Sequence, residues 1–168
     1  MTKPTAAESD RVILYRGHTD GSTVTIERPG ALGAVARLPH YVKHSPTGFS
    51  WGYAGSGPAD LARSLLIDAL GDSAQCNVCH GTSKVVYDTA TDTDIPLDDT
   101  TRELIDAEPD RYSPPMGCLA CENGWTVRPL LYQEFKFDVV STLHGSWTLT
   151  RADIVAWVDQ HTHSDGQP

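Results

Sequence analysis

Alternation of apolar and polar residues near the start of the chain predicts a β-hairpin. The segments RVILYRG (residues 11–17) and TVTIER (residues 23–28) each have the two-residue period of a strand, and an Asp-Gly pair at residues 20–21 supplies the turn between them. A further short strand is expected near residues 35–38, in a stretch whose prolines limit regular structure. The N-terminal part of the chain is therefore expected to form a hairpin or a small antiparallel sheet.

Apolar residues at helical spacing predict about three helices. The first covers residues 58–70 and begins with a proline, which is favoured at the first helical position. The second covers residues 128–143 (RPLLYQEFKFDVVSTL), where apolar residues recur at every fourth position; part of this segment also alternates as in a strand, but its length favours the helix. The third lies within residues 145–160, where Thr150 and Asp153 have the spacing of a capping box.

The segment between the first and second predicted helices differs in composition from the rest of the chain. Residues 72–126 contain all four cysteines, 11 acidic residues and 3 basic residues. Within this segment, SKVVYD (residues 83–88) predicts a short strand, and Asp98 or Asp99 is placed to cap a helix through residues 101–108. The Thr/Asp-rich run between these two elements has few core-forming residues, so the segment reads as an inserted module.

These patterns together predict an α+β protein. The expected core combines residues 11–71 and 127–160, in which an N-terminal hairpin or small antiparallel sheet is packed by about three helices. Residues 72–126 form an inserted, acidic, zinc-ribbon-like module, and residues 1–10 and 161–168 are expected to be flexible tails.

The cysteines predict a structural zinc site. Cys76 and Cys79 form one CxxC pair, and Cys118 and Cys121 form the other, so two turns supply the four thiolates of a tetrahedral site. The 38 residues between the pairs exceed the spacing of common zinc ribbons, roughly 15 to 20 residues. Disulfides are one alternative, but thiols inside cells are kept reduced, and a redox CxxC is another, but the thioredoxin-like βαβ context is missing. A catalytic zinc with His80 as a ligand is the third, and we favour the structural site over it because four sulfurs already complete the shell.

A glycine-rich stretch, GFSWGYAGSGPADLA (residues 48–62), is a second candidate for chemistry. Free N–H groups before a helix can bind an anion, but Pro58 removes one N–H and Asp60 places a carboxylate at the same end. We therefore expect a structural turn whose aromatic residues pack on the core and in which Asp60 stabilises the first turn of the helix. His40 and His44 precede this stretch and are weak candidates for a general base.

Three segments carry a family resemblance: HSPTGFSWGYAGSGPADLA, YQEFKFDVV and WTLTRADIVAW. They resemble a small family of bacterial and phage-associated domains of unassigned function that share a GFxWGYxGSGPxxLA motif. The resemblance implies a compact α+β domain of phage or prophage origin, with the cysteine module inserted into a normally short connection. It implies no catalytic residue.

Charge and hydropathy narrow the function classes. The chain has a net charge of -9, no signal-peptide pattern in residues 1–10 and no run of about 18 apolar residues, so we expect a soluble, cytoplasmic protein with no membrane partner. The concentration of acid in residues 72–126 argues against nucleic-acid binding.

The favoured hypothesis is a non-enzymatic, zinc-stabilised interaction protein, phage or prophage encoded, whose protein partner is a host factor. One alternative is a small hydrolase or a nucleotide- or anion-binding protein that uses the glycine turn with His40 or His44. A pocket that contains both histidines beside Gly55 and Gly57 would support this alternative. A second alternative is a zinc-dependent nucleic-acid binder. The sequence names no catalytic residue and no oligomeric state.

Overall fold

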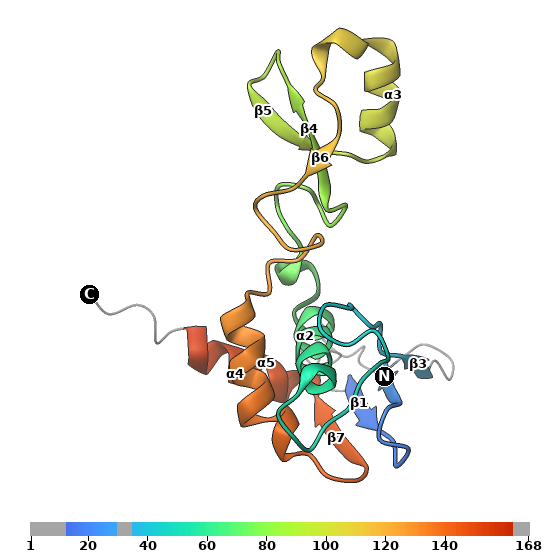
Figure 1. The fold of residues 1–168 in the computed structure, drawn as a ribbon, viewed down its shortest axis with the longest axis vertical. Helices are drawn as coiled ribbons and strands as arrows, with labels where there is room; N and C mark the ends of the chain where they lie inside the picture. Colours follow the sequence, from blue (N-terminus) through green and yellow to red (C-terminus); the bar gives the residue numbers. More distant parts are fainter. Residues whose placement is uncertain (1–12, 30–34, 163–168) are drawn as a thin grey trace, which may run out of the picture. The chain divides into compact units, whose positions relative to one another are not determined.

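The computed structural model describes residues 13–29 and 35–162, and the chain divides into two compact units. Unit 1 comprises Met1–Leu70 and Arg128–Pro168, and unit 2 comprises Gly71–Val127 (Figure 1). Antiparallel sheets, four helices and a cluster of four cysteines in the described ranges confirm the predicted α+β class. The predicted tail at residues 1–10 and nearly all of the tail at 161–168 lie outside the described residues.

Unit 1 contains a four-stranded antiparallel sheet with the strand order β3-β2-β1-β7. The predicted hairpin is confirmed, because β1 pairs with β2 in a register that places Leu14 opposite Glu27. The fourth strand, β7, pairs with the outer edge of β1 and was not predicted. The strands are β1 (Leu14–Gly17), β2 (Val24–Glu27), β3 (Val35–Arg37) and β7 (Trp147–Thr150).

Helix α2 (Ser56–Leu70) is the central element of unit 1, and α4 (Pro129–Asp138) and α5 (Arg151–Thr162) pack against it (Figure 1). Twelve of its 15 residues are buried, so it is covered on nearly every side. The hydroxyl of Tyr15 in β1 donates to Asp68 of α2 at 2.7 Å and ties the sheet to this helix. None of the helices in the described part of the chain is long and apolar enough to cross a lipid bilayer.

Helix α4 is shorter than predicted. It ends at Asp138 instead of continuing to residue 143, and a 3-10 turn (Val140–Thr142) follows it. The run Val-Val-Ser-Thr at this point consists of residues with low helix propensity, because β-branched side chains lose rotamer freedom and serine competes for backbone hydrogen bonds. The buried side chains here are Tyr132, Phe135, Lys136 and Val140.

Unit 2 is built on a three-stranded antiparallel sheet with the order β5-β4-β6. Its elements are β4 (Lys84–Asp88), β5 (Thr93–Pro96), α3 (Asp99–Ala107) and β6 (Met116–Gly117). The predicted strand at residues 83–88 and the predicted helix are confirmed, and Asp98 caps α3 by accepting from the amide of Thr101 at 2.8 Å. Strand β5 lies in the Thr/Asp-rich run and was not predicted.

Two adjacent valines of β4 divide the interior of unit 2 into two small clusters. Val85 packs with the cysteines, and Val86 packs with Leu97 and Tyr112, against which Ile105 of α3 also lies. Because successive side chains of a strand point to opposite faces, β4 separates the cysteine cluster from the cluster under α3. Unit 2 therefore has little apolar core that does not involve its cysteines.

Candidate functional site

The four cysteine sulfurs lie within 4.8 Å of one another. The Sγ atoms of Cys76 and Cys118 are 3.8 Å apart, and those of Cys79 and Cys121 are 3.5 Å apart. These separations are too long for disulfide bonds, and all four cysteines are free. A tetrahedron of sulfurs at about 2.3 Å from a zinc ion has edges of about 3.8 Å, so the donor set fits a thiolate-bound metal ion.

Backbone amides support the sulfurs in both CxxC turns. Burial alone raises the pKa of Cys76, but hydrogen bonds from the amides of Cys79 and Val78 outweigh it and lower that pKa to about 7. Burial raises the pKa of Cys118 and that of Cys121 above their usual value, and the nearby amides of Ala120 and Gly124 offset this only in part. Amide donors that favour the thiolate form are the surroundings that a metal-binding thiol requires.

Each CxxC pair is followed by residues in the left-handed backbone region. His80 and Gly81 have φ angles of 48° and 82°, and Asn123 and Gly124 have φ angles of 53° and 89°. The two turns are joined by the amide of Cys76, which donates to the carbonyl oxygen of Gly124 at 2.9 Å. This backbone contact brings together two cysteine pairs that are far apart in the sequence.

His80 is not a member of the group of metal-ligating side chains. Its side chain is exposed, and its carbonyl oxygen accepts a hydrogen bond from Gln75 at 3.0 Å. Within the part of the chain that the structure describes, the group of potential ligands consists of the four cysteines. This arrangement offers four sulfur ligands and supports a closed site rather than one in which His80 leaves a position for a substrate.

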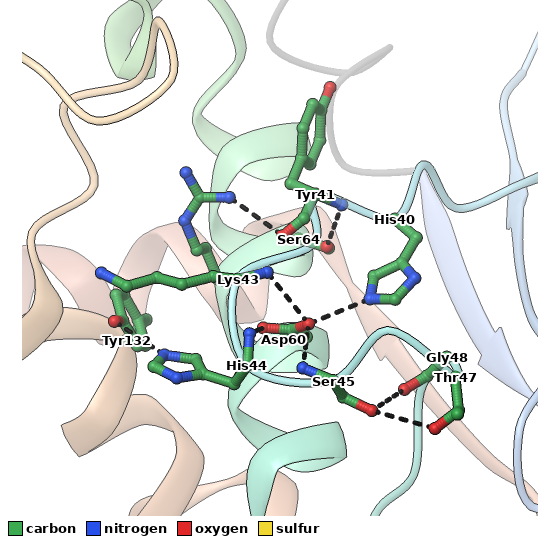
Figure 2. A network of polar contacts seen from close by, with 11 residues as sticks. His40, Tyr41, Lys43, His44, Ser45, Thr47, Gly48, Asp60, Ser64 and Tyr132 are labelled. Atoms are coloured by element: carbon green, nitrogen blue, oxygen red, sulfur yellow. Dashed lines mark hydrogen bonds and ion pairs between the residues drawn. The ribbon is translucent and has the colours of Figure 1, made fainter.

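A second cluster of polar residues surrounds Asp60 of α2 in unit 1 (Figure 2). Asp60 is fully buried and accepts hydrogen bonds from the backbone amides of Lys43, His44 and Ser45 at 2.9 to 3.2 Å. The Nε2 atom of His40 lies 3.1 Å from the same carboxylate. Three consecutive amides and one imidazole thus converge on a single side chain, which fixes the loop of residues 40–48.

The hydrogen bonds at Asp60 outweigh its burial. Burial by itself raises the pKa of this carboxyl, but the amides of Ser45 and His44, the His40 ring and the amide of Lys43 hold the pKa below its usual value. Asp60 is the fifth residue of α2, so the prediction that it stabilises the first turn of the helix is wrong. Its function is to hold the preceding loop.

The two candidate histidines have different surroundings. The ring of His40 packs at a tilt against Phe49, with ring centroids 4.7 Å apart, whereas the Nε2 atom of His44 lies 3.0 Å from the hydroxyl of Tyr132 in α4. A pocket of about 320 Å³ is lined by His40 but not by His44, Gly55 or Gly57. The arrangement expected for a hydrolase built on the glycine turn is therefore not met at this pocket.

The glycines of residues 48–62 accommodate close contacts within unit 1. A Cβ on Gly57 would lie 2.1 Å from the Ser50 hydroxyl, and one on Gly52, whose φ is 82°, would lie 2.9 Å from the carbonyl oxygen of Leu143. Trp51 packs edge-on against Trp147, as expected, but Tyr53 is 53% exposed and does not join the core. Close packing contacts of this kind account for the glycines of the turn.

Comparison with protein families assigns part of the chain to a family. Residues 15–99 match a family of unknown function, DUF6166, and these residues make up half of the chain. The chain belongs to DUF6166. Searches of curated proteins and of solved structures gave no match.

The DUF6166 match and the family resemblance found in the sequence cover different residues. It includes Cys76 and Cys79, which the resemblance assigned to an insert, and it ends before Cys118 and Cys121. The segments YQEFKFDVV and WTLTRADIVAW also lie beyond residue 99. Membership of DUF6166 thus covers the sheet strands β1 to β3, helix α2 and the β4-β5 hairpin, and it assigns no activity to them.

Proposed function

We propose that this protein is a non-enzymatic interaction protein whose unit 2 is held together by a structural zinc ion and provides the contact surface for a protein partner. The partner proposed is a host factor, in line with the phage-associated domains that the sequence resembles. The observation that carries the proposal is the cluster of four sulfurs within 4.8 Å of one another, in a segment with 11 acidic and 3 basic residues.

The composition of unit 2 supports a structural metal. Its interior consists of two small clusters, one of which is made largely of the cysteines themselves. Thiolates that surround an ion can supply folding free energy on the order of 10 kcal/mol in small zinc modules, which compensates for a small apolar core. Zinc favours four sulfur ligands in a tetrahedron, and the sulfur separations fit this geometry.

The surface of unit 2 supports a contact with a basic protein. Exposed carboxylates occur along α3 and in the residues after it, and Leu104 of the same helix is 45% exposed. Leu119 lies between two cysteines of the second CxxC turn and is 99% exposed. An apolar side chain on a rigid turn loses little conformational entropy on binding, and the surrounding negative charge would steer a positively charged partner.

Elemental analysis of the purified full-length chain tests the metal. We expect about one equivalent of zinc, and less than about half an equivalent of any thiolate-bound metal would count against a tight structural site. Iron bound in place of zinc would be recognised by its visible absorption. That result would change the identity of the proposed ion but would leave the four-sulfur site in place.

Affinity capture from the native host, followed by binding measurements with the purified captured protein, tests the contact surface. Replacing Glu103 and Asp106 of α3 with Gln and Asn should weaken binding by about tenfold, because both side chains are exposed and charged. The matched control replaces Asp138 and Asp159 of unit 1 with Asn and should leave the affinity within about twofold. Equal effects of the two pairs would place the contact elsewhere.

A further inference from the structure

Unit 1 contains a pocket of about 320 Å³ that is separate from the cysteine cluster. It lies among the turn of the β1-β2 hairpin, the end of β3 and the loop that Asp60 holds. Its volume is within the range of small-molecule sites, roughly 300 to 1,000 Å³. The lining residues are Ser22, Thr23, Val24, Arg37, Leu38, His40, Thr47, Gly48 and Phe49.

The polar side chains of this pocket favour an anion. Arg37 is exposed at the end of β3 and is the only lining residue with a fixed charge, in a chain whose net charge is -9. Ser22 adds a hydroxyl group that can donate a hydrogen bond, and the Thr47 hydroxyl, which lies 3.3 Å from the Ser45 hydroxyl, can donate to a ligand in place of Ser45. The carboxylate nearest in sequence, Asp20, is not a lining residue and is already bonded to the amides of Ser22 and Thr23.

His40 is oriented by Asp60. Its Nε2 atom lies 3.1 Å from the Asp60 carboxylate, which fixes the N–H on Nε2, and its side chain is 23% exposed. Figure 2 shows the second ring nitrogen pointing away from Asp60. Among the residues that the structure describes, no partner is found for this Nδ1 atom. It can therefore accept a hydrogen bond or, once protonated, donate one to a ligand.

We propose that this pocket binds a dianionic phosphate group, either free or as the monoester of a small molecule. Arg37 supplies the charge-assisted hydrogen bonds, His40 contacts a phosphate oxygen through Nδ1, and Thr47 and Ser22 bond to the remaining oxygens. A carboxylate has two oxygens to share among these donors, whereas a phosphate group presents three or four, so phosphate satisfies more of the lining groups.

The buried carboxylate of Asp60 stays ionised, but the hydrogen bonds that it accepts partly screen its charge from an anion in the pocket. Three backbone amides and the His40 ring share its charge. When a phosphate group enters, the His40 ring lies against both the phosphate group and the Asp60 carboxylate, with Nε2 facing Asp60. The apolar residues Val24, Leu38 and Phe49 provide a wall for the carbon part of a monoester.

An NMR titration of the full-length, zinc-loaded protein tests this proposal with inorganic phosphate and phenyl phosphate as probes. We expect millimolar or tighter binding, with amide shifts concentrated in residues 22–24, 37–40 and 47–49. Tighter binding of phenyl phosphate would identify a monoester site, and equal binding would identify a site for free phosphate. Shifts spread over the surface, or none by about 20 mM probe, would overturn the proposal.

Two matched variants separate the pocket from general charge effects. Arg37→Gln should raise the dissociation constant by about tenfold or more, because it removes the pocket's only fixed positive charge. Arg102→Gln makes the same change at an exposed arginine of α3 in unit 2 and should alter the constant by less than about twofold. Equal effects would refute the site. Thr47→Val leaves the charge unchanged and should also raise the dissociation constant. An unchanged constant would show that Thr47 is not part of the binding site.

Discussion

The backbones of Gly81 and Gly124 are in direct contact: a Cβ atom on Gly124 would lie 2.4 Å from the carbonyl oxygen of Gly81. Both glycines have positive φ angles and each follows a CxxC pair. The two turns can approach this closely because Gly124 has no side chain. Gly81 has no room for one either, since a Cβ there would lie 2.6 Å from the side-chain nitrogen of Gln75. The cysteine cluster therefore depends on two residues that contribute no ligand atom.

Gly124→Ala should destabilise unit 2 by about 2 kcal/mol or more, because the substitution combines backbone strain with a clash against Gly81. Competition with a metal chelator should show weaker metal binding, and thermal unfolding should show a lower Tm. Gly117→Ala is the matched control in the same unit, since a Cβ there meets no atom within 4 Å. If both variants bound metal like the wild type, the contact would have no energetic importance.

Removal of the metal should unfold unit 2 and leave unit 1 folded. Unit 1 has its own apolar core around α2, whereas one of the two clusters of unit 2 is made largely of cysteines. Limited proteolysis after chelation should therefore cut within Gly71–Val127 and spare α2, α4 and α5. Addition of zinc should restore the original resistance. Identical cleavage with and without chelator would contradict a structural role for the ion.

Asp60→Asn should destabilise unit 1 by about 3 kcal/mol. An amide keeps one acceptor oxygen but places an NH2 group against the amides of Lys43, His44 and Ser45 or the His40 ring, where it cannot accept their hydrogen bonds. Urea unfolding followed by the fluorescence of Trp51 and Trp147 measures this change. Asp159→Asn, at an exposed position of α5, should change the free energy of unfolding by less than about 0.5 kcal/mol.

The same carboxylate should make unit 1 sensitive to acid. Because the folded pKa of Asp60 is lowered, its contribution to stability is complete above the unfolded pKa of about 3.9 and is lost as the pH falls through the folded value. The free energy of unfolding, measured from about pH 6 to about pH 3, should therefore decrease more steeply in the wild type than in Asp60→Asn. Parallel curves would show that Asp60 titrates equally in both states.

Thr150→Ala should cost about 1 kcal/mol, because it removes the hydroxyl that accepts from the amide of Asp153 at 3.0 Å at the start of α5. The Asp153 carboxylate accepts in return from the amide of Thr150 at 2.9 Å, which completes the predicted capping box. Urea unfolding of the variant beside Thr19→Ala, an exposed threonine of the hairpin turn, measures the difference. Equal free energies of unfolding for the two variants would show that the cap does not stabilise the protein.

Local sequence patterns correctly predicted those features in which residues close together in the sequence also contact one another in the fold. The Asp-Gly turn predicted the β1-β2 hairpin, the spacing of Thr150 and Asp153 predicted the start of α5, and the CxxC spacing identified all four sulfurs that come together. Strand β7 was missed although its four residues, Trp-Thr-Leu-Thr, alternate apolar and polar as in a strand. The segment is short and runs directly into the capping box of α5, and its partner β1 lies more than a hundred residues away in the sequence.

The sequence also failed to reveal what Asp60 does. A carboxylate in a helix is usually an exposed or capping group, and Asp60 was therefore not expected to be buried. One signal was present: Asp60 stands between Ala59 and Leu61 in a run with few polar residues. A charge in a helix that is buried all round requires partners, and residues 40–45 supply them.

The division of unit 1 into two stretches of sequence has a consequence for synthesis on the ribosome. Helix α2 emerges before Gly71–Val127, whereas α4 and α5, which cover it, emerge afterwards. The apolar faces of α2 therefore wait for their partners while all of unit 2 is translated, and unit 2 can bind its metal and fold during that interval. A ribosome-bound chain that ends at Val127 and is extended by a linker long enough to fill the exit tunnel should contain a folded unit 2 and an incomplete unit 1, and protease protection would detect this order.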